Sequence, residues 1–174
     1  MTQATSRKSV RKQRGFTLIE MMIAVVMILV GLVAVAQLVS ASIFLNSANR
    51  DDSTSVVLAQ NELNQFVNQQ LSSSSFTDSF GNTCNLGGTA NAWVGSPLAT
   101  SNDNRQVIDF SQGAVNNYSF TSTDVNDPSG TRYDVRWAVY TFASNAGKRF
   151  IIGVRKTGGN RPFLPVNLDT VVTK

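Results

Sequence analysis

The chain has 174 residues, a formal net charge of +4, one cysteine and no histidine. This length suits one domain with an appendage better than two full domains. The lone Cys84 excludes an intramolecular disulfide, and the lack of histidine excludes Cys/His zinc sites and His-based catalytic arrangements. The acids show no spacing that suggests a catalytic pair. We therefore expect a protein that is not an enzyme, with no catalytic residue, no metal site and no cofactor.

The excess positive charge lies at the N-terminus. Five bases and no acid precede Gly15, namely Arg7, Lys8, Arg11, Lys12 and Arg14. From Phe16 onward ten bases stand against all eleven acids, so this part carries a formal charge of −1. The charge of the whole chain therefore does not indicate an acidic partner.

An apolar run of 24 residues follows, from Phe16 to Val39, interrupted by Thr17, Glu20 and Gln37. As a helix it would extend about 36 Å, enough to cross a hydrocarbon core of about 30 Å. A cleaved secretory signal is the alternative, because bases precede the run and the residues AVA at 34–36 resemble a signal-peptidase site. The run is longer than the roughly 7 to 15 residues of such signals, and it contains an acid.

The stretch RGFTLIEMMIAVVMI at 14–28 closely resembles the class III signal of type IV prepilins and pseudopilins. The resemblance rests on a basic leader that ends in Gly15, followed by Phe16, Thr17, Leu18 and a glutamate at 20 in an apolar helix. It covers about the first 40 residues strongly and the rest only in layout.

The resemblance implies a processing site and a set of partners. A prepilin peptidase would cleave between Gly15 and Phe16 and N-methylate Phe16, removing residues 1–15 and leaving the apolar helix, residues 16–45, on the mature protein. The chain would sit in the bacterial inner membrane with a cytoplasmic N-terminus and an external head, as the positive-inside rule also predicts. It would then join other pilin subunits, through the inner-membrane assembly platform, in a pilus or periplasmic filament.

Glu20 has two interpretations. With Thr17 it satisfies the S/T-x-x-E spacing of a capping box, so its carboxylate could accept from a backbone N–H at the helix start. The second is pairing with a Phe16 amine freed by cleavage. This could be the amine of the same chain, four residues earlier on the same helix face, or that of a neighbouring subunit, which is the role the family assigns. We favour pairing for subunit assembly, accompanied by capping, because a carboxylate in a membrane is costly without a partner.

The helix is expected to continue as an amphipathic half over residues 46–71, since apolar residues recur there at helical spacing. A break is possible within residues 47–55, with Asp52 or Ser53 as a new N-cap. Gly31 is the helix-weakening residue of the membrane half and the expected centre of any bending. Residues 72–105, rich in Ser, Asn and Gly, are expected to form a polar loop. We favour Phe76, Phe80 and Trp93 as residues that hold it to the domain; a contact surface for a neighbour is the alternative.

Residues 106–174 are predicted to form an antiparallel β head. Strands are predicted at 106–110, 117–125, 131–142 and 149–156, the last two as a hairpin, with a further short strand near 168–172. In the third, apolar Tyr133, Val135, Trp137 and Val139 alternate with charged Arg132, Asp134 and Arg136, as in a half-buried strand. The expected fold class is α+β and pilin-like, with a long N-terminal helix packed on a sheet of about four strands.

Basic residues return in the last 27 residues, with a net charge of +5. Binding of DNA or of a partner is possible through Lys148, Arg149, Arg155, Lys156 and Arg161. A solvated face that contacts the acidic part of a neighbour is the interpretation we favour, because residues 51–147 carry −6.

The apolar helix and the final hairpin look most like PilV-type minor pilins, which predicts a minor subunit of a type IV pilus. A minor pseudopilin of a type II secretion system and a DNA-binding minor pilin of a competence filament are the alternatives.

Overall fold

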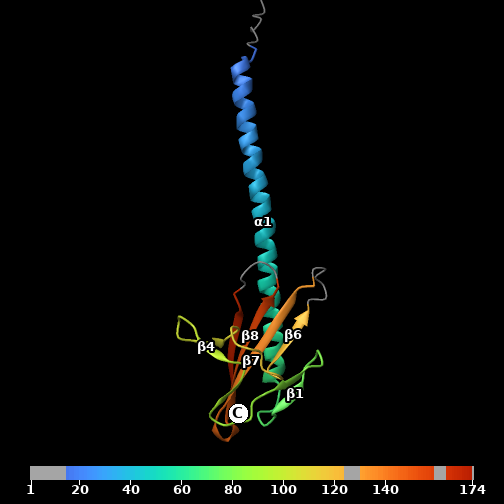
Figure 1. Cartoon of the computed structure of the whole chain (residues 1–174), viewed down its shortest axis with the longest axis vertical. Coiled ribbons are helices and arrows are strands. Elements are labelled where there is room, and N and C mark those ends of the chain that lie inside the picture. The colour runs from blue at the N-terminus through green and yellow to red at the C-terminus, as the bar shows by residue number, and fades with distance from the viewer. Residues whose placement is uncertain (1–14, 124–129, 159–163, 174) are drawn as a thin grey trace, which may run out of the picture. The chain divides into compact units, whose positions relative to one another are not determined.

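The computed structural model describes residues 15–123, 130–158 and 164–173 (Figure 1). The chain divides into two compact units, Met1–Asn46 and Ser47–Lys174, and helix α1 (Leu18–Val67) contributes to both. The strands are β1 (Ser75–Thr77), β2 (Thr83–Asn85), β3 (Trp93–Gly95), β4 (Leu98–Thr100), β5 (Gln106–Ile108), β6 (Ser119–Thr123), β7 (Arg132–Thr141), β8 (Gly147–Thr157) and β9 (Val166–Thr173). This content confirms the α+β class, a long apolar N-terminal helix with antiparallel sheets.

Helix α1 begins two residues later and ends earlier than the apolar pattern suggested. Thr17 is the N-cap residue that starts the helix, because its side-chain oxygen accepts a hydrogen bond from the Glu20 N–H. At the other end the Gln69 N–H bonds the Phe66 carbonyl, a tighter turn that ends the helix near Val67. The break proposed at 47–55 is wrong, since α1 is helical throughout that segment.

The head is built on one five-stranded antiparallel sheet. Strands β6, β7, β8 and β9 pair in chain order, and β3 pairs with the part of β7 that β6 leaves free. The expected hairpin is present, with Thr141 opposite Lys148 and the short 3-10 turn Ala143–Asn145 between the strands. The strand predicted at 106–110 is shorter, lies outside this sheet and pairs with β4 instead.

The main core lies between this sheet and the second half of α1, which runs behind β7 and β8 in Figure 1. Phe66 of the helix meets Trp137 of β7 with ring centroids 5.2 Å apart, and Phe150 of β8 at 5.7 Å. The Trp137 indole N–H donates to the Asn85 carbonyl at 2.8 Å, so its one polar atom is satisfied inside the core. Trp137 is fully buried and is the largest such side chain in the described residues.

Strand β7 is buried on both faces, not on one as its alternating sequence suggested. Its charged positions Asp134 and Arg136 are 8% and 6% exposed. They bond each other, and Arg136 also donates to the Gln112 carbonyl at 2.7 Å. The sheet face opposite the helix is therefore covered, and its charges are satisfied internally.

The cover on that face is the β4–β5 hairpin, whose Ile108 packs on Ile151 of β8. Gly153 of β8 makes this approach possible. A Cβ at this position would lie 2.8 Å from the Ile108 Cβ and 2.9 Å from the Asn167 Oδ1. The Asn167 oxygen in turn accepts the Ile108 N–H at 3.0 Å, which joins the hairpin to β9.

The segment 72–105 is not the polar loop that its composition indicated, because it contains β1 to β4. Two of its aromatic side chains are anchored: Phe76 packs edge-on against Phe66 at 5.8 Å, and Trp93 against Tyr140 at 5.4 Å. Phe80 stays 58% exposed, although its ring lies 6.4 Å from that of Phe120. Short strands of three residues are hard to detect in Ser- and Asn-rich sequence because they contain few β-formers.

An ion pair joins the second half of α1 to the sheet. The Lys156 ammonium lies 2.5 Å from the Asp51 carboxylate, and the two side chains are only 18% and 12% exposed. By contrast, Arg105 and Asp103 form a pair at the same distance whose side chains are 80% and 47% exposed.

We expect Gly153→Ala to destabilise the head by about 1–3 kcal/mol, because the added methyl overlaps Ile108 and Asn167. Chemical denaturation of the full chain in detergent measures this. Gly113→Ala is the control, since a Cβ there meets nothing within 4 Å. Equal stability of both variants would contradict the close approach.

A double-mutant cycle of Asp51→Asn and Lys156→Met should give a coupling free energy of about 2 kcal/mol, because the pair is largely withdrawn from water. The same cycle with Asp103→Asn and Arg105→Met should give less than about 1 kcal/mol. Similar coupling in the two cycles would show that Asp51 does not hold the helix to β8.

Candidate functional site

The residues predicted to take part in processing and assembly lie together at the start of helix α1. Gly15 and Phe16 precede the helix, and Thr17 caps it. The Glu20 N–H donates to the Thr17 Oγ1 at 3.3 Å and to the Thr17 carbonyl at 3.1 Å. The Thr17 side chain therefore makes its half of the capping box.

The Glu20 carboxylate does not complete the box. Within residues 15–123, 130–158 and 164–173, no hydrogen bond or ion pair to it is found, and the residue is exposed. Its position in the first turn is still favourable, because the helix dipole is positive there. The carboxylate is thus left available for a partner outside the described chain.

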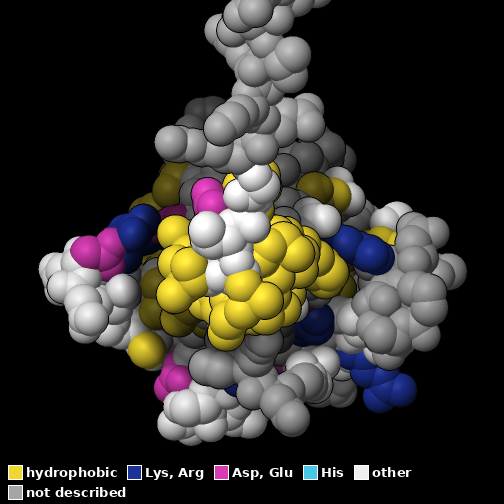
Figure 2. Space-filling view, turned by 90° about the horizontal axis from the view of Figure 1, so that it is seen from above, with side chains coloured by type: hydrophobic (Ala, Val, Ile, Leu, Met, Phe, Trp, Pro, Cys, Tyr) yellow, Lys and Arg dark blue, Asp and Glu magenta, His cyan; other side chains and the backbone are white. Residues whose placement is uncertain are grey.

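Around this acid the helix is apolar on all sides. Phe16, Leu18 and Met27 are 80%, 82% and 72% exposed, and residues as far as Leu45 are similarly open. Figure 2, which views the molecule from its helix end, shows hydrophobic side chains gathered around the helix. This is the one helix among the described residues that is long and apolar enough to cross a membrane, with 0% of its most apolar stretch buried.

Gly31 lies within this surface, in an uninterrupted part of the helix. A Cβ at Gly31 would meet nothing within 4 Å, so no packing in the chain itself requires glycine there. Its role in helix bending stays a prediction. The basic leader, residues 7–14, lies outside the described residues.

The structure does not bring the C-terminal bases together. In β8, Lys148 and Lys156 lie on the sheet face that packs against α1. Arg149 and Arg155 lie on the opposite face. Arg161 lies outside the described residues.

The two lysines are engaged within the head. Lys148 is 3% exposed and donates to the Ser73 carbonyl at 2.6 Å, and burial lowers the pKa of its ammonium. Lys156 is paired with Asp51, as described above.

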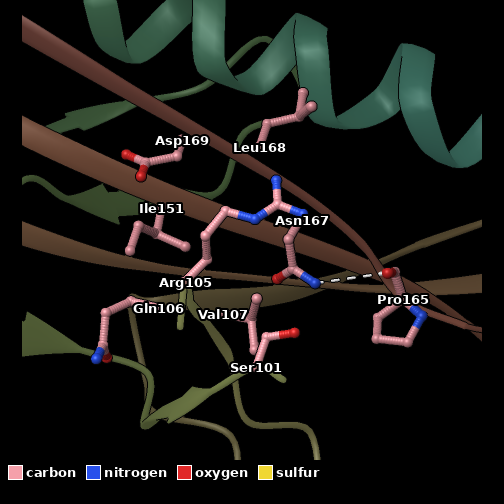
Figure 3. A pocket seen from close by; sticks show the side chains of 9 residues that line it. All are labelled: Ser101, Arg105, Gln106, Val107, Ile151, Pro165, Asn167, Leu168 and Asp169. Atoms are coloured by element: carbon pink, nitrogen blue, oxygen red, sulfur yellow. Dashed lines mark hydrogen bonds between the residues drawn. The ribbon is translucent and has the colours of Figure 1, made fainter. Parts of the chain in front are cut away.

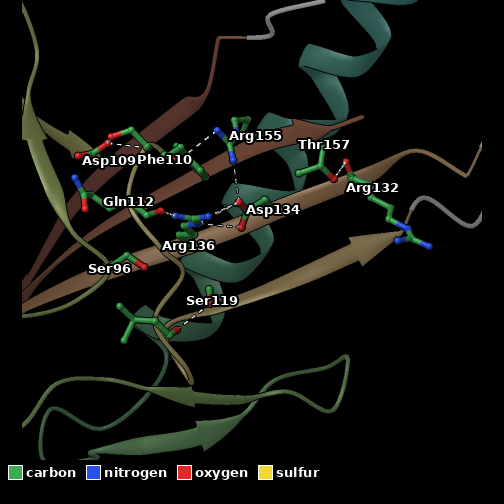
Figure 4. A network of polar contacts seen from close by, with 12 residues as sticks. Ser96, Asp109, Phe110, Gln112, Ser119, Arg132, Asp134, Arg136, Arg155 and Thr157 are labelled. Atoms are coloured by element: carbon green, nitrogen blue, oxygen red, sulfur yellow. Dashed lines mark hydrogen bonds and ion pairs between the residues drawn. The ribbon is translucent and has the colours of Figure 1, made fainter. Parts of the chain in front are cut away.

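Arg149 and Arg155 are engaged as well. Arg149 bonds the Asp169 carboxylate and lies 5.6 Å from the centre of the Trp93 ring. Arg155 stacks over Phe110 at 4.7 Å and reaches the Asp134 carboxylate at 3.4 Å (Figure 4). These four side chains therefore serve as internal contacts of the head.

Sequence reasoning missed the acids that neutralise these bases. Asp134 could have been found from its spacing, because Arg136 two residues later lies on the same face of a strand. Asp51 is 105 residues from Lys156, and Asp169 is 20 residues from Arg149. No local pattern connects such pairs.

A cavity of about 420 Å³ lies where the β4–β5 hairpin meets β8 and β9. Figure 3 shows its lining residues, which include Arg105, Gln106 and Asp169. Both charged side chains are already paired, Arg105 with Asp103 and Asp169 with Arg149. We assign no ligand to this cavity.

Comparison with known proteins supports the N-terminal site. Residues 10–36 match the family model described as the prokaryotic N-terminal methylation motif. No curated protein and no solved structure matches the chain. The matched segment contains Gly15, Phe16, Thr17 and Glu20 and extends into the exposed apolar helix. The match supports a class III signal of the type IV pilin-like kind at the N-terminus of this chain.

Proposed function

We propose that the chain is a minor pilin, a structural and non-enzymatic subunit that takes part in assembly of a type IV pilus. The observation that carries this proposal is the start of α1. There the methylation motif leads into a helix that is apolar on every side and has one acid, Glu20, without a partner in the described chain.

An apolar surface of this kind requires a cover. Burying apolar side chains is favourable by about 25 cal/mol per Å², and a helix that is apolar all round is stable only inside protein or lipid. Before assembly the bilayer supplies that environment, and afterwards the helices of neighbouring subunits do. Membrane anchoring and association with other pilins follow generally from the motif.

Pairing of Glu20 with the Phe16 amine of a neighbour explains the acid in this surface. Peptidase cleavage after Gly15 creates that amine, and a charge in an apolar environment is stable when it is paired. Phe16 of the same chain precedes helix α1, and its own amine is the alternative partner of Glu20.

We propose a membrane topology for the chain and the kind of filament that it joins. The bases of the leader would hold the N-terminus in the cytoplasm, where the prepilin peptidase acts, and place the head outside. The minor-pilin assignment rests on the resemblance of the apolar helix and final hairpin to PilV-type proteins. DNA uptake is less well supported, because Lys148, Arg149, Arg155 and Lys156 each already contact another group of the head.

Mass spectrometry of the mature protein should find an N-terminus at methylated Phe16. Gly15→Ala changes the residue before the cleaved bond and should leave the leader attached, whereas Gly31→Ala, in the same helix, should be processed normally. A mature N-terminus at Met1 or near Ala36 would overturn the proposal.

Glu20→Ala should leave membrane insertion and cleavage intact but lower the amount of the chain in sheared filaments at least severalfold, since the Phe16 amine of the neighbour loses its partner. Immunoblots of membrane and filament fractions measure the ratio. Asp52→Ala removes an exposed acid elsewhere on the same helix and serves as the control. Equal incorporation of the two variants would reject the pairing.

A further inference from the structure

Three potential metal ligands meet where the second half of α1 packs on the β1–β2 hairpin. Glu62 belongs to α1, Asp78 to the turn after β1, and Cys84 to β2. One carboxylate oxygen from each acid and the Cys84 sulfur all lie within 4.8 Å of one another, and all three residues are buried.

Glu62 supplies an unsatisfied atom in this cluster. The residue is 0% exposed, its Oε1 accepts from Gln65 at 3.2 Å, and its buried Oε2 has no hydrogen-bond partner. A buried acceptor without a partner is costly and rare in folded proteins. Glu62 Oε2 would therefore be stabilised by a bound cation or by a proton.

Asp78 is already oriented for binding. Its Oδ1 accepts the backbone N–H groups of Phe80 and Asn82 at 2.9 and 2.7 Å, and its Oδ2 accepts the Asn82 side-chain amide at 2.8 Å. Hydrogen bonds of this kind fix the direction of a carboxylate and are common around metal ligands.

Cys84 has no strong contact of its own. Its sulfur lies 4.0 Å from the Asp78 Oδ2 and 3.8 Å from the Asn82 carbonyl, both weak interactions. The residue is 0% exposed, so its thiol cannot meet a cysteine of another chain while the head is folded. An intermolecular disulfide does not account for it.

We propose that Glu62, Asp78 and Cys84 bind one zinc ion, through one oxygen of each carboxylate and the thiolate sulfur, and that the ion links helix α1 to the β1–β2 hairpin. Zinc accepts sulfur and oxygen ligands together, whereas calcium and magnesium prefer oxygen alone. The proposal goes beyond the assembly function, which involves the other end of the helix.

The spacing suits an ion of this size. For three atoms within 4.8 Å of one another, some point lies no more than about 2.8 Å from each (4.8/√3). Zinc–sulfur and zinc–oxygen distances are about 2.3 Å and 2.0–2.2 Å, so shifts of about 0.5 Å for the sulfur and about 0.6–0.8 Å for the oxygens bring the ligands into range.

Binding releases protons and gives the buried Glu62 carboxylate a partner. In the metal-free head, burial and the nearby Asp78 raise the pKa of Glu62 to about 7 and that of Cys84 to about 12. Zinc displaces the thiol proton, and the Glu62 proton where it is present, and the two go to solvent. The former orphan Oε2, or its partner oxygen, then coordinates the ion.

The test uses the untagged full chain in detergent micelles, freed of metal with a chelator. Because the chain has no histidine, no imidazole competes for the ion. Titration with zinc chloride should show one ion per chain and a rise in the unfolding midpoint. Cobalt chloride should give a thiolate-to-metal absorption band, which requires Cys84 itself.

Each of Glu62→Gln, Asp78→Asn and Cys84→Ser should weaken zinc binding at least about tenfold. Cys84→Ser should also abolish the cobalt band. Asp103→Asn removes an exposed acid outside the cluster and should bind zinc like the wild type. Circular dichroism of the metal-free variants shows that they fold, and Cys84→Ala replaces Cys84→Ser if that variant does not.

Two results would overturn the proposal. One is the absence of stoichiometric zinc binding by the wild-type chain. The other is zinc binding that persists unchanged in the folded Cys84 variant, which would place the ion elsewhere. In the first case, a higher stability of Glu62→Gln than of the metal-free wild type would identify Glu62 as a protonated core acid.

Discussion

The contact of Phe66 with Trp137 is the interaction on which the head depends. It joins the second half of α1 to the central strand β7, and the rings of Tyr118 and Phe120 complete the cluster around the indole. β7 has partners on both edges and cover on both faces, so the sheet, the helix and the β4–β5 hairpin are all organised around it. Removing bulk at Trp137 would leave a cavity beside Phe66, Tyr118 and Phe120, at a cost of about 3–5 kcal/mol in the free energy of unfolding.

The two halves of α1 differ in what covers their apolar side chains. From Asp51 onward one face of the helix is buried by its own head, with Ala59 and Phe66 at 0% and 1% exposure. Before Asn46 no side chain in the described part of the helix has such cover. A single helix therefore has one half whose partner is encoded in the chain and one half whose partner must come from elsewhere. The class III signal at its start is consistent with that division, because the proposed cleavage after Gly15 would keep the apolar half on the mature protein.

Sequence reasoning could predict what depends on local pattern. The apolar run, the Thr17 cap and the β7–β8 hairpin all follow from spacing, β-branched residues and turn residues within a few positions. The strands within 72–105 could not be predicted, because they are held by distant contacts such as Phe76 on Phe66. The burial of Asp134 was missed for the same reason: strand alternation identifies two faces, but not that a hairpin covers the second. The grouping of Glu62 with Cys84 depends on how a helix and a hairpin dock, which no spacing encodes.

Because the bases of β8 are paired with acids of the head, mutating them does not test partner binding alone. Asp51, Asp134 and Asp169 each receive a base from β8, and the first two acids are about 8% exposed. Reversing Arg155 or Lys156 places a second carboxylate beside such a buried acid, which destabilises the head before any partner is involved. A loss of DNA or filament binding in such a variant would then report on folding. Surface recognition by this head is better examined at exposed positions such as Phe80 and Val171, which are 58% and 51% exposed and can be changed without separating an ion pair.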